Sequence, residues 1–329
     1  MSRILTILLF IAAVVTGAWA WERSNFVAPG PVAPGGARAT VVEIAPHQGL
    51  MRIARELESA GAIRNAWVFA VDVRLRGEGA RLRAGEYAIA SRLSMQRIAD
   101  LLISGRVIEH KLTAAEGLTS QMIAGRVNAD RALAGPLAST PAEGTLLPET
   151  YLFTKGTLRH ALLARMRAAQ ARFLAQAWQT RAPGLPLRSP REAVTLASIV
   201  EKETALPEER RHVAAVFINR LRLGMKLESD PTVIYGLSRG YPLGHGLRAS
   251  ELASITPYNT YLVAGLPPTP ICNPGKDSIS AVLNPENSAD LYFVANGTGG
   301  HAFAATKLEQ DRNVARWRQI ESATLHPKP

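Results

Sequence analysis

The sequence is poor in the residues that build disulfides and metal sites. Cysteine occurs once in 329 residues, as Cys272, and aromatic residues make up 6% of the chain. One cysteine excludes an intramolecular disulfide and any metal site that needs two thiolates, so the fold must be stabilised by packing. Cys272 lies in a proline-rich loop without a nearby activating base, and we assign it no role. We expect no metal and no cofactor.

Acidic residues are also in deficit. The 38 Lys and Arg outnumber the 27 Asp and Glu, which gives a formal net charge of +11. The basic residues are spread along the chain, which is typical of a protein beside anionic lipid or polymer, although a basic bias without a specific anionic partner fits equally well. Nucleic acid is not an expected partner, because the sequence has no zinc-finger or RNA-recognition motif and no basic patch interleaved with aromatic residues.

One long hydrophobic run is present, from Ile4 to Trp21, and it contains no charge. A helix of that length just spans the hydrocarbon layer of a bilayer, which is about 30 Å thick. We therefore expect residues 1–22 to form a transmembrane anchor with its N-terminus in the cytoplasm, because Arg3 precedes the run. The alternative is a cleaved signal peptide, since the Ala18-Trp19-Ala20 triplet resembles a cleavage site.

The remaining chain divides into a linker and two α+β segments. Residues 23–39 are rich in proline and glycine and are predicted to form a semi-extended spacer. Hydrophobic periodicity predicts a small α+β module over residues 40–112, with strands at 40–44, 82–89 and 107–112 and helices at 49–59, 67–73 and 94–104. A larger mixed α+β domain is predicted over residues 113–329, with helices at 158–180, 191–204 and 208–223 and a buried strand at 291–295.

The predicted helix 191–204 carries the residues most suited to chemistry. It reads REAVTLASIVEKET, so Glu201 directly follows a strongly apolar run. Burial next to such a run raises the pKa of a carboxyl group, and a protonated glutamate is able to donate to a glycosidic oxygen. Glu203 is rotated by about 200° from Glu201, so only one of the two faces the apolar side. On spacing alone, the charged end of an ordinary surface helix explains both residues equally well.

Several loop residues are candidates for binding a sugar. Tyr258, Asn259 and Asn273 lie in proline-stiffened loops, where amides and aromatic rings suit carbohydrate. Asp230 follows Ser229 and precedes Pro231, which gives it an adequate structural role at a helix start. His301 ends a glycine-rich turn and has no second histidine or cysteine at metal spacing, so it is a site residue or a structural histidine.

Seven segments of the chain resemble the YceG-like family of endolytic murein transglycosylases. They are ASIVEKET at 197–204, VFINRL at 216–221, SDPTVIYG at 229–236, YNTY at 258–261, GLPP at 265–268, and LYFV at 291–294 with GGH at 299–301. The resemblance extends from about residue 40 to the end of the chain, and it departs from the family pattern only at Cys272.

The resemblance implies both an architecture and an activity. Residues 40–112 would be a LysM-like, glycan-binding module, and residues 113–329 would be the catalytic domain, located in the periplasm on the inner membrane. The family cleaves MurNAc–GlcNAc bonds inside nascent glycan strands, leaves 1,6-anhydro-MurNAc ends and so terminates elongation. Glycan strands, membrane lipid and peptidoglycan synthases are the implied partners.

The family's catalytic acid/base glutamate corresponds to Glu201, with Glu203 as the fallback. Low-ranking candidates for holding the sugars are Glu203, Asp230, Tyr235, Tyr258, Asn259, Asn273 and His301. Two alternatives stay open. A muramidase-type hydrolase would need Asp230 or Glu203 as a second carboxylate and would give reducing ends. A non-catalytic peptidoglycan-binding scaffold would release no fragments.

Overall fold

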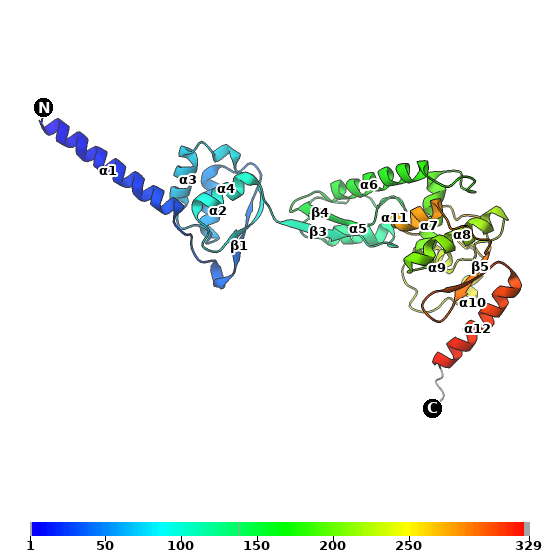
Figure 1. Cartoon of the computed structure of the whole chain (residues 1–329). Helices are drawn as coiled ribbons and strands as arrows, with labels where there is room; N and C mark the ends of the chain where they lie inside the picture. The colour runs from blue at the N-terminus through cyan, green and yellow to red at the C-terminus, as the bar shows by residue number, and fades with distance from the viewer. Residues whose placement is uncertain (1, 138, 326–329) are drawn as a thin grey trace. The chain divides into compact units, whose positions relative to one another are not determined.

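The computed structural model of the chain describes residues 2–137 and 139–325 (Figure 1). It is an α+β protein, as the sequence predicts, and it divides into two compact units. The first unit comprises residues 1–110 and 152–156, and the second comprises residues 111–151 and 157–329.

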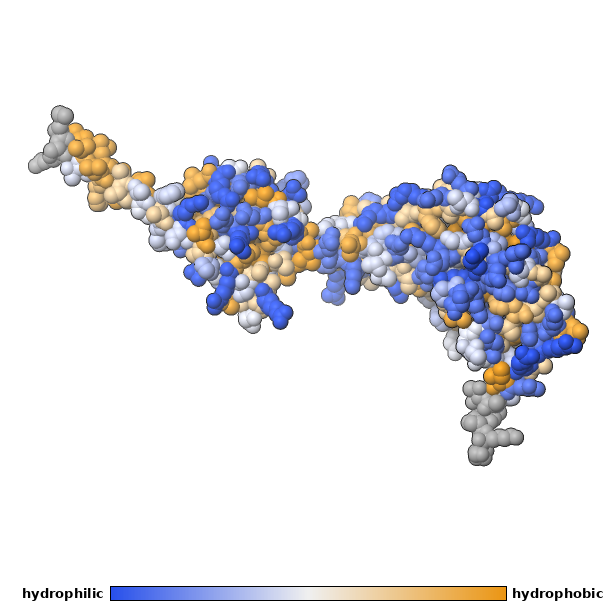
Figure 2. All heavy atoms as spheres, in the orientation of Figure 1, coloured by the Kyte–Doolittle hydropathy of each residue, from blue (hydrophilic) through white to orange (hydrophobic). Residues whose placement is uncertain are grey.

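The chain begins with helix α1, Ser2–Val27. Its segment Ile4–Val27 is long and apolar enough to cross a membrane. The large apolar side chains of this helix, such as Phe10, are exposed, and Figure 2 shows them as a hydrophobic stretch on the surface. An exposed apolar helix of this length is unfavourable in water, so α1 has the composition expected of a bilayer-spanning segment.

The first unit is built on one two-stranded antiparallel sheet. Its strands are β1, Ala39–Ile44, and β2, Gly85–Ala90, and Val42 lies opposite Tyr87 in the register. The connection contains α2, Leu50–Ser59, and α3, Ala66–Leu75, and α4, Met95–Ser104, follows β2. Short 3₁₀ turns are present at Pro34–Gly36 (η1) and Gly79–Arg81 (η2). Ser94 caps α4, because its side chain accepts a hydrogen bond from the backbone N–H of Arg97.

The segment predicted as a spacer, residues 23–39, is not free. Its first residues continue α1, and the fully buried Phe26 packs against Phe69 with ring centroids 6.4 Å apart. The backbone N–H of Gly30 donates to the carbonyl of Arg92, and that of Ala33 donates to the Ser91 hydroxyl. Proline and glycine prevent a helix here, but the backbone groups that remain find partners on the first unit.

The second unit is mainly helical. Its strands β5, Tyr292–Ala295, and β6, His301–Ala304, pair with each other. Strands β3, Glu109–Thr113, and β4, Thr150–Thr154, also pair with each other, and each of them contributes residues to both units. The predicted strand at 291–295 is half-buried rather than buried. The helices are α5, Ser120–Ala129; α6, Arg159–Gln179; α7, Pro190–Glu203; α8, Arg210–Arg222; α9, Asp230–Ser238; α10, Ala249–Leu252; α11, Lys276–Leu283; and α12, Lys307–Leu325, with a 3₁₀ turn η3, Pro207–Glu209.

Helix α7 forms the centre of the second unit. All residues from Ala193 to Val200 are buried, so the helix is enclosed on every side and not along one stripe alone. It packs against α8 and α11, and Phe217 of α8 belongs to the same apolar core. Burial ends at Glu201, where the helix leaves the core. The last turn of α7 therefore presents its carboxylates at the boundary between core and solvent.

Candidate active site

The local sequence positions the end of α7 from both sides. The Ser189 side chain accepts a hydrogen bond from the backbone N–H of Glu192 at 3.2 Å, and Pro190 occupies the first helical turn. The helix ends at Glu203, so Glu201 and Glu203 both lie in its last turn. Both are partly accessible to solvent. The negative end of the helix dipole lies here and disfavours charge on a carboxyl group.

Glu203 is held by the start of α9. The Ser229 hydroxyl donates a hydrogen bond to Oε1 of Glu203 at 2.5 Å. Burial of the carboxyl raises the pKa of Glu203 to about 7; the Ser229 hydrogen bond and the Arg220 charge oppose this rise, and the Asp230 charge adds to it. A carboxyl group with this pKa exchanges its proton readily at neutral pH, as a general acid/base requires.

The groups around Glu203 are themselves fixed. Thr260 accepts a hydrogen bond from the Ser229 backbone at 3.0 Å, and the phenol of Tyr261 donates to the Asp230 carboxylate at 2.6 Å. Burial and the Asp230 carboxylate raise the pKa of the Tyr261 phenol, which therefore stays a donor. Arg220 of α8 is buried and donates to the carbonyl oxygens of Leu227 and Leu291, at 2.8 Å and 2.7 Å.

Glu201 has different neighbours, which confirms that the two glutamates face different sides of the helix. Its Oε2 accepts a hydrogen bond from the backbone N–H of Gly275 at 2.8 Å. Gly275 has no room for a side chain, because a Cβ would lie 1.8 Å from Oε1 of Glu116. Burial, followed by the charge of Glu201, raises the pKa of Glu116, whose carboxylate lies 3.8 Å from Arg210. Glu201 thus anchors the loop before α11.

The two asparagine candidates are structural in their contacts. Asn273 is fully buried; its amide donates to the Glu143 carboxylate at 3.1 Å and accepts from the Leu146 backbone at 2.9 Å. Asn259 is also fully buried, and its amide donates to the carbonyls of Leu252 and Ser254. These contacts engage both side chains within the protein, so the asparagines support loops and have little left to offer a sugar.

The tyrosine candidates form a pair. The rings of Tyr235 and Tyr258 meet edge to face, with centroids 4.8 Å apart. The Tyr235 hydroxyl donates to Oε2 of Glu143 at 3.2 Å, and the Tyr258 hydroxyl is 2.9 Å from that of Thr269. Burial, with Glu143 as the next cause, raises the pKa of Tyr235 to about 12. The pair is therefore bound to the loop that carries Glu143.

His301 belongs to another part of the unit. Its Nδ1 lies 2.6 Å from a carboxylate oxygen of Glu209, and its ring packs edge to face on Phe293. A cavity of about 420 Å³ lies beside it and is lined by the glycine-rich turn and Trp317. Within residues 2–137 and 139–325, no group of three His, Cys, Asp or Glu is arranged to hold a metal ion.

Three site residues were missed by sequence reasoning. Ser229 occupies the cap position of α9, yet no hydrogen bond to its side chain caps the helix, and its hydroxyl binds Glu203 instead. Tyr261 and Glu143 lie in two of the polar loop segments, but nothing in the local sequence distinguishes them from their neighbours. Only the tertiary fold brings these groups to Asp230 and Tyr235.

A partly accessible carboxyl group at the end of a buried core helix, with its pKa raised to about 7, is a setting that suits general acid/base chemistry. A sequence model of the YceG-like family matches residues 42–316. The chain belongs to this family.

Known proteins resemble the chain to different extents. The endolytic murein transglycosylase of Streptococcus pneumoniae serotype 2 is 27% identical, over 95% of this chain and 64% of its own length. The enzyme of the same name from Bacillus subtilis is 33% identical, over 55% of this chain and 49% of its own length. The alignments thus span between about half and two thirds of these relatives. The crystal structure of a YceG-like protein from Listeria monocytogenes is 28% identical with a TM-score of 0.53, over 84% of this chain and 98% of that one.

Proposed function

We propose that the protein is a membrane-anchored endolytic murein transglycosylase in which Glu203 is the general acid/base. The observation that carries this proposal is the setting of Glu203, a partly accessible carboxyl at the end of a core helix with its pKa raised to about 7. The names of the relatives support murein as the polymer that is cleaved.

The reaction needs one carboxyl group. Protonated Glu203 donates its proton to the oxygen that links MurNAc to GlcNAc, and the bond from that oxygen to C1 of MurNAc breaks. The Glu203 carboxylate then removes the proton from the 6-hydroxyl of the same MurNAc, whose oxygen attacks C1. The products are a 1,6-anhydro-MurNAc end and a GlcNAc end with a free 4-hydroxyl. Because the nucleophile is part of the substrate, its effective concentration is high.

This assignment differs from the sequence-based one. The family resemblance implies Glu201 by the match of its motif, and the apolar run before Glu201 separately suggests a raised pKa for that carboxyl. In the structure it is Glu203 that burial affects in this way, whereas Glu201 accepts a hydrogen bond from Gly275. We therefore propose Glu203 for proton transfer and Glu201 for positioning the loop that contains Gly275.

The rest of the chain would bring the site to its substrate. We propose that α1 stays in the inner membrane with its N-terminus in the cytoplasm, which leaves the rest of the chain in the periplasm beside nascent strands. The order strand, helix, helix, strand in β1–α2–α3–β2 supports a LysM-like, glycan-binding role for the first unit. Peptidoglycan synthases are the proposed protein partners, since they produce the strands to be cut.

The test is digestion of uncrosslinked glycan strands by the full-length chain in detergent, with products identified by mass. We expect anhydro ends from wild type, a loss of about 10²–10⁴-fold in Glu203→Gln, and activity within about tenfold of wild type in Glu201→Gln. The opposite pattern would return the acid/base role to Glu201.

The products also decide between reaction classes. Reducing ends, heavier by one water, would identify a muramidase-type hydrolase, for which the Asp230 carboxylate near Glu203 would be the second acidic group. No fragments from wild type, with murein still bound, would identify a peptidoglycan-binding scaffold.

A further inference from the structure

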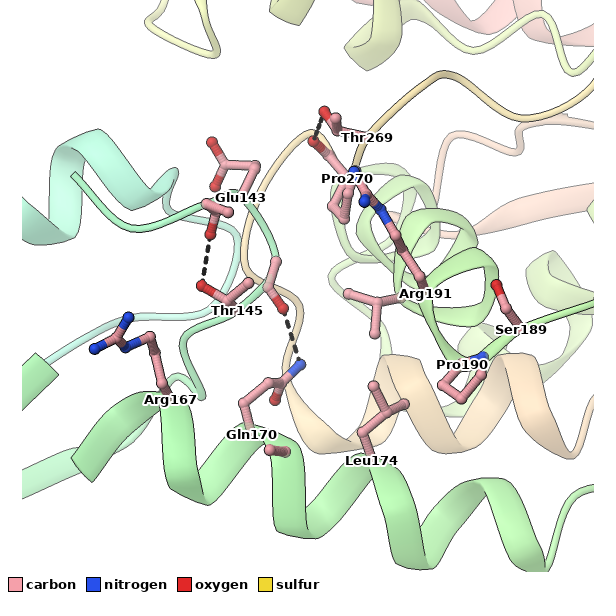
Figure 3. A pocket seen from close by; sticks show the side chains of 14 residues that line it. Glu143, Thr145, Arg167, Gln170, Leu174, Ser189, Pro190, Arg191, Thr269 and Pro270 are labelled. Atoms are coloured by element: carbon pink, nitrogen blue, oxygen red, sulfur yellow. Dashed lines mark hydrogen bonds between the residues drawn. The ribbon is translucent and has the colours of Figure 1, made fainter. Parts of the chain in front are cut away.

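One cavity in the second unit takes no part in the proposed chemistry. It has a volume of about 630 Å³ and lies between α6, the first turn of α7, the loop at residues 142–145, and Thr269 with Pro270 (Figure 3). Its lining is mostly apolar and consists largely of small side chains, such as Ala142, Ala171 and Val194. A cavity of this size and character suits a ligand with methyl-sized groups.

One buried polar atom in this cavity lacks a partner. Gln170 of α6 is 3% exposed, and its amide nitrogen donates to the Gly144 carbonyl at 3.2 Å. Its Oε1 is buried and has no hydrogen-bond partner among the described residues. A buried acceptor left unpaired is unfavourable, because it has lost its hydrogen bonds to water. Since Figure 3 shows Gln170 extending from α6 toward the cavity, an N–H donor of a ligand would satisfy it.

The charged groups at the cavity favour an acidic ligand. Arg167 and Arg191 line it with exposed side chains, and neither forms an ion pair within the described part of the chain. The positive end of the α7 dipole points to the same place, because Pro190 and Arg191 begin that helix. Glu143 forms no ion pair with either arginine within the described residues, and its oxygens accept hydrogen bonds from the Ser120 backbone and the Tyr235 hydroxyl, at 2.7 Å and 3.2 Å.

The cavity is connected to Glu203 through α9. Glu143 lines the cavity and binds Tyr235, while Asp230, at the start of the same helix, lies next to Glu203. Arg191 at the cavity and Glu203 lie near opposite ends of α7, twelve residues or about 18 Å apart along the helix axis. An extended peptide of five residues covers about 16–18 Å. A five-residue peptide attached to a sugar at Glu203 therefore reaches the cavity when it is extended.

We propose that this cavity binds the peptide branch of the murein strand that Glu203 cleaves, and this inference rests on the proposed function. The ligand is a short acidic peptide whose alanine methyls contact the apolar wall. Its carboxylates pair with Arg167 and Arg191, and a backbone N–H donates to Oε1 of Gln170. The enzyme would thus recognise strands that still carry their peptides.

The experiment compares two substrates of the full-length chain in detergent: uncrosslinked strands with their peptides, and the same strands stripped by an amidase. The variants are Arg167→Ala/Arg191→Ala, which removes both cations, and Ala171→Trp, which fills the cavity. Arg172→Ala is the matched control, because Arg172 is an exposed residue of α6 that does not line the cavity. The readout is kcat/KM for release of anhydro ends.

We expect wild type to prefer peptide-bearing strands by about tenfold or more. Both cavity variants should lose that preference, while their kcat/KM on stripped strands should equal that of wild type. The Arg172→Ala control should keep the preference. Equal cleavage of both substrates by wild type would overturn the inference and leave the proposed function intact. So would a preference that both variants retain. Cleavage of neither substrate would contradict the proposed function itself.

A binding experiment tests the inference without cleavage. Titration of Glu203→Gln with the synthetic peptide L-Ala-γ-D-Glu-L-Lys-D-Ala-D-Ala should show binding, and adding Ala171→Trp should abolish it. If the peptide did not bind to Glu203→Gln, the inference would also be overturned.

Discussion

The hydroxyl of Ser229 lies 2.5 Å from Oε1 of Glu203 and donates a hydrogen bond to it across the gap between α9 and α7. Burial favours the neutral form of Glu203, whereas this hydrogen bond favours the carboxylate. The pKa of about 7 results from the competition between the two. Ser229 therefore adjusts the proton affinity of the proposed acid/base without contacting the substrate.

Removing this hydroxyl is expected to move the pH dependence of activity. A hydrogen bond to a charged group contributes about 1.5–3 kcal/mol, and one pK unit corresponds to about 1.4 kcal/mol, so Ser229→Ala should raise the pKa of Glu203 by about one unit or more. The fall of kcat/KM at high pH, where the acid loses its proton, should shift upward by the same amount. Ser238→Ala, at the other end of α9, is the control and should keep the wild-type pH profile. If Ser229→Ala also kept the wild-type pH profile, Glu203 would not be the acid.

The raised pKa of Glu203 also predicts how stability depends on pH. The unfolded group titrates near 4.5 and the folded group near 7, so as pH rises between these values the unfolded state releases its proton first. The free energy of unfolding should therefore fall over this interval and stay low above pH 7. Glu203→Gln removes the effect, and we expect it to be more stable than wild type by about 1–3 kcal/mol at pH 8 and equally stable below pH 4.

Denaturant unfolding of the full-length chain, followed for the second unit, measures this difference. Glu201→Gln is the matched control, because it removes a glutamate from the same helical turn. A Glu203→Gln variant that is less stable than wild type at pH 8 would show that the carboxyl is not enclosed as described.

The sequence predicted the helix that carries the site but not which of its glutamates is enclosed. Rotation of about 200° between Glu201 and Glu203 follows from helix geometry, and the structure agrees. Enclosure of Glu203 depends on Ser229 and Arg220, which arrive from α9 and α8 through tertiary packing. No local pattern records such contacts, so the sequence alone does not show which of the two carboxyl groups is enclosed.

The loop residues illustrate a second limit. Asn259 and Asn273 were chosen because amides suit sugar hydroxyls, yet the structure uses both amides inside the protein. Proline-rich loops lack N–H donors of their own, and buried backbone groups in them need side-chain partners as much as a sugar would. Composition cannot separate these two uses.

Two elements near the C-terminus were not predicted. The strand β6 was missed because the glycine-rich turn before His301 was interpreted as the end of a single strand and not as the turn of a hairpin. The helix α12 was missed because it has no strong apolar stripe.

Asn273 should be among the most sensitive positions for stability. Asn273→Leu keeps the approximate volume but leaves the Leu146 N–H, the Leu118 carbonyl and the Glu143 carboxylate with fewer partners. Each unpaired buried group costs about 1–3 kcal/mol, so we expect a loss of about 3–5 kcal/mol from the second unit. Asn287→Leu, at an exposed position, is the control and should stay within about 0.5 kcal/mol of wild type. If urea unfolding showed that Asn273→Leu lowers the free energy of unfolding by less than about 1 kcal/mol, the hydrogen bonds of Asn273 would not be what holds these loops together.

Phe26 tests whether the membrane helix is fixed to the first unit. The residue ends the apolar part of α1, is fully buried and packs on Phe69, while its neighbour Val27 is 45% exposed. Truncation of a buried phenylalanine costs about 3–5 kcal/mol, because contacts are lost and a cavity remains. We expect Phe26→Ala to destabilise the first unit by this amount and to increase protease cleavage between residues 28 and 38, since the Pro/Gly segment would separate from Arg92. Val27→Ala should change neither the unfolding transition of the first unit nor the cleavage. If Phe26→Ala behaved like Val27→Ala, residues 23–39 would act as the free spacer that their composition suggests.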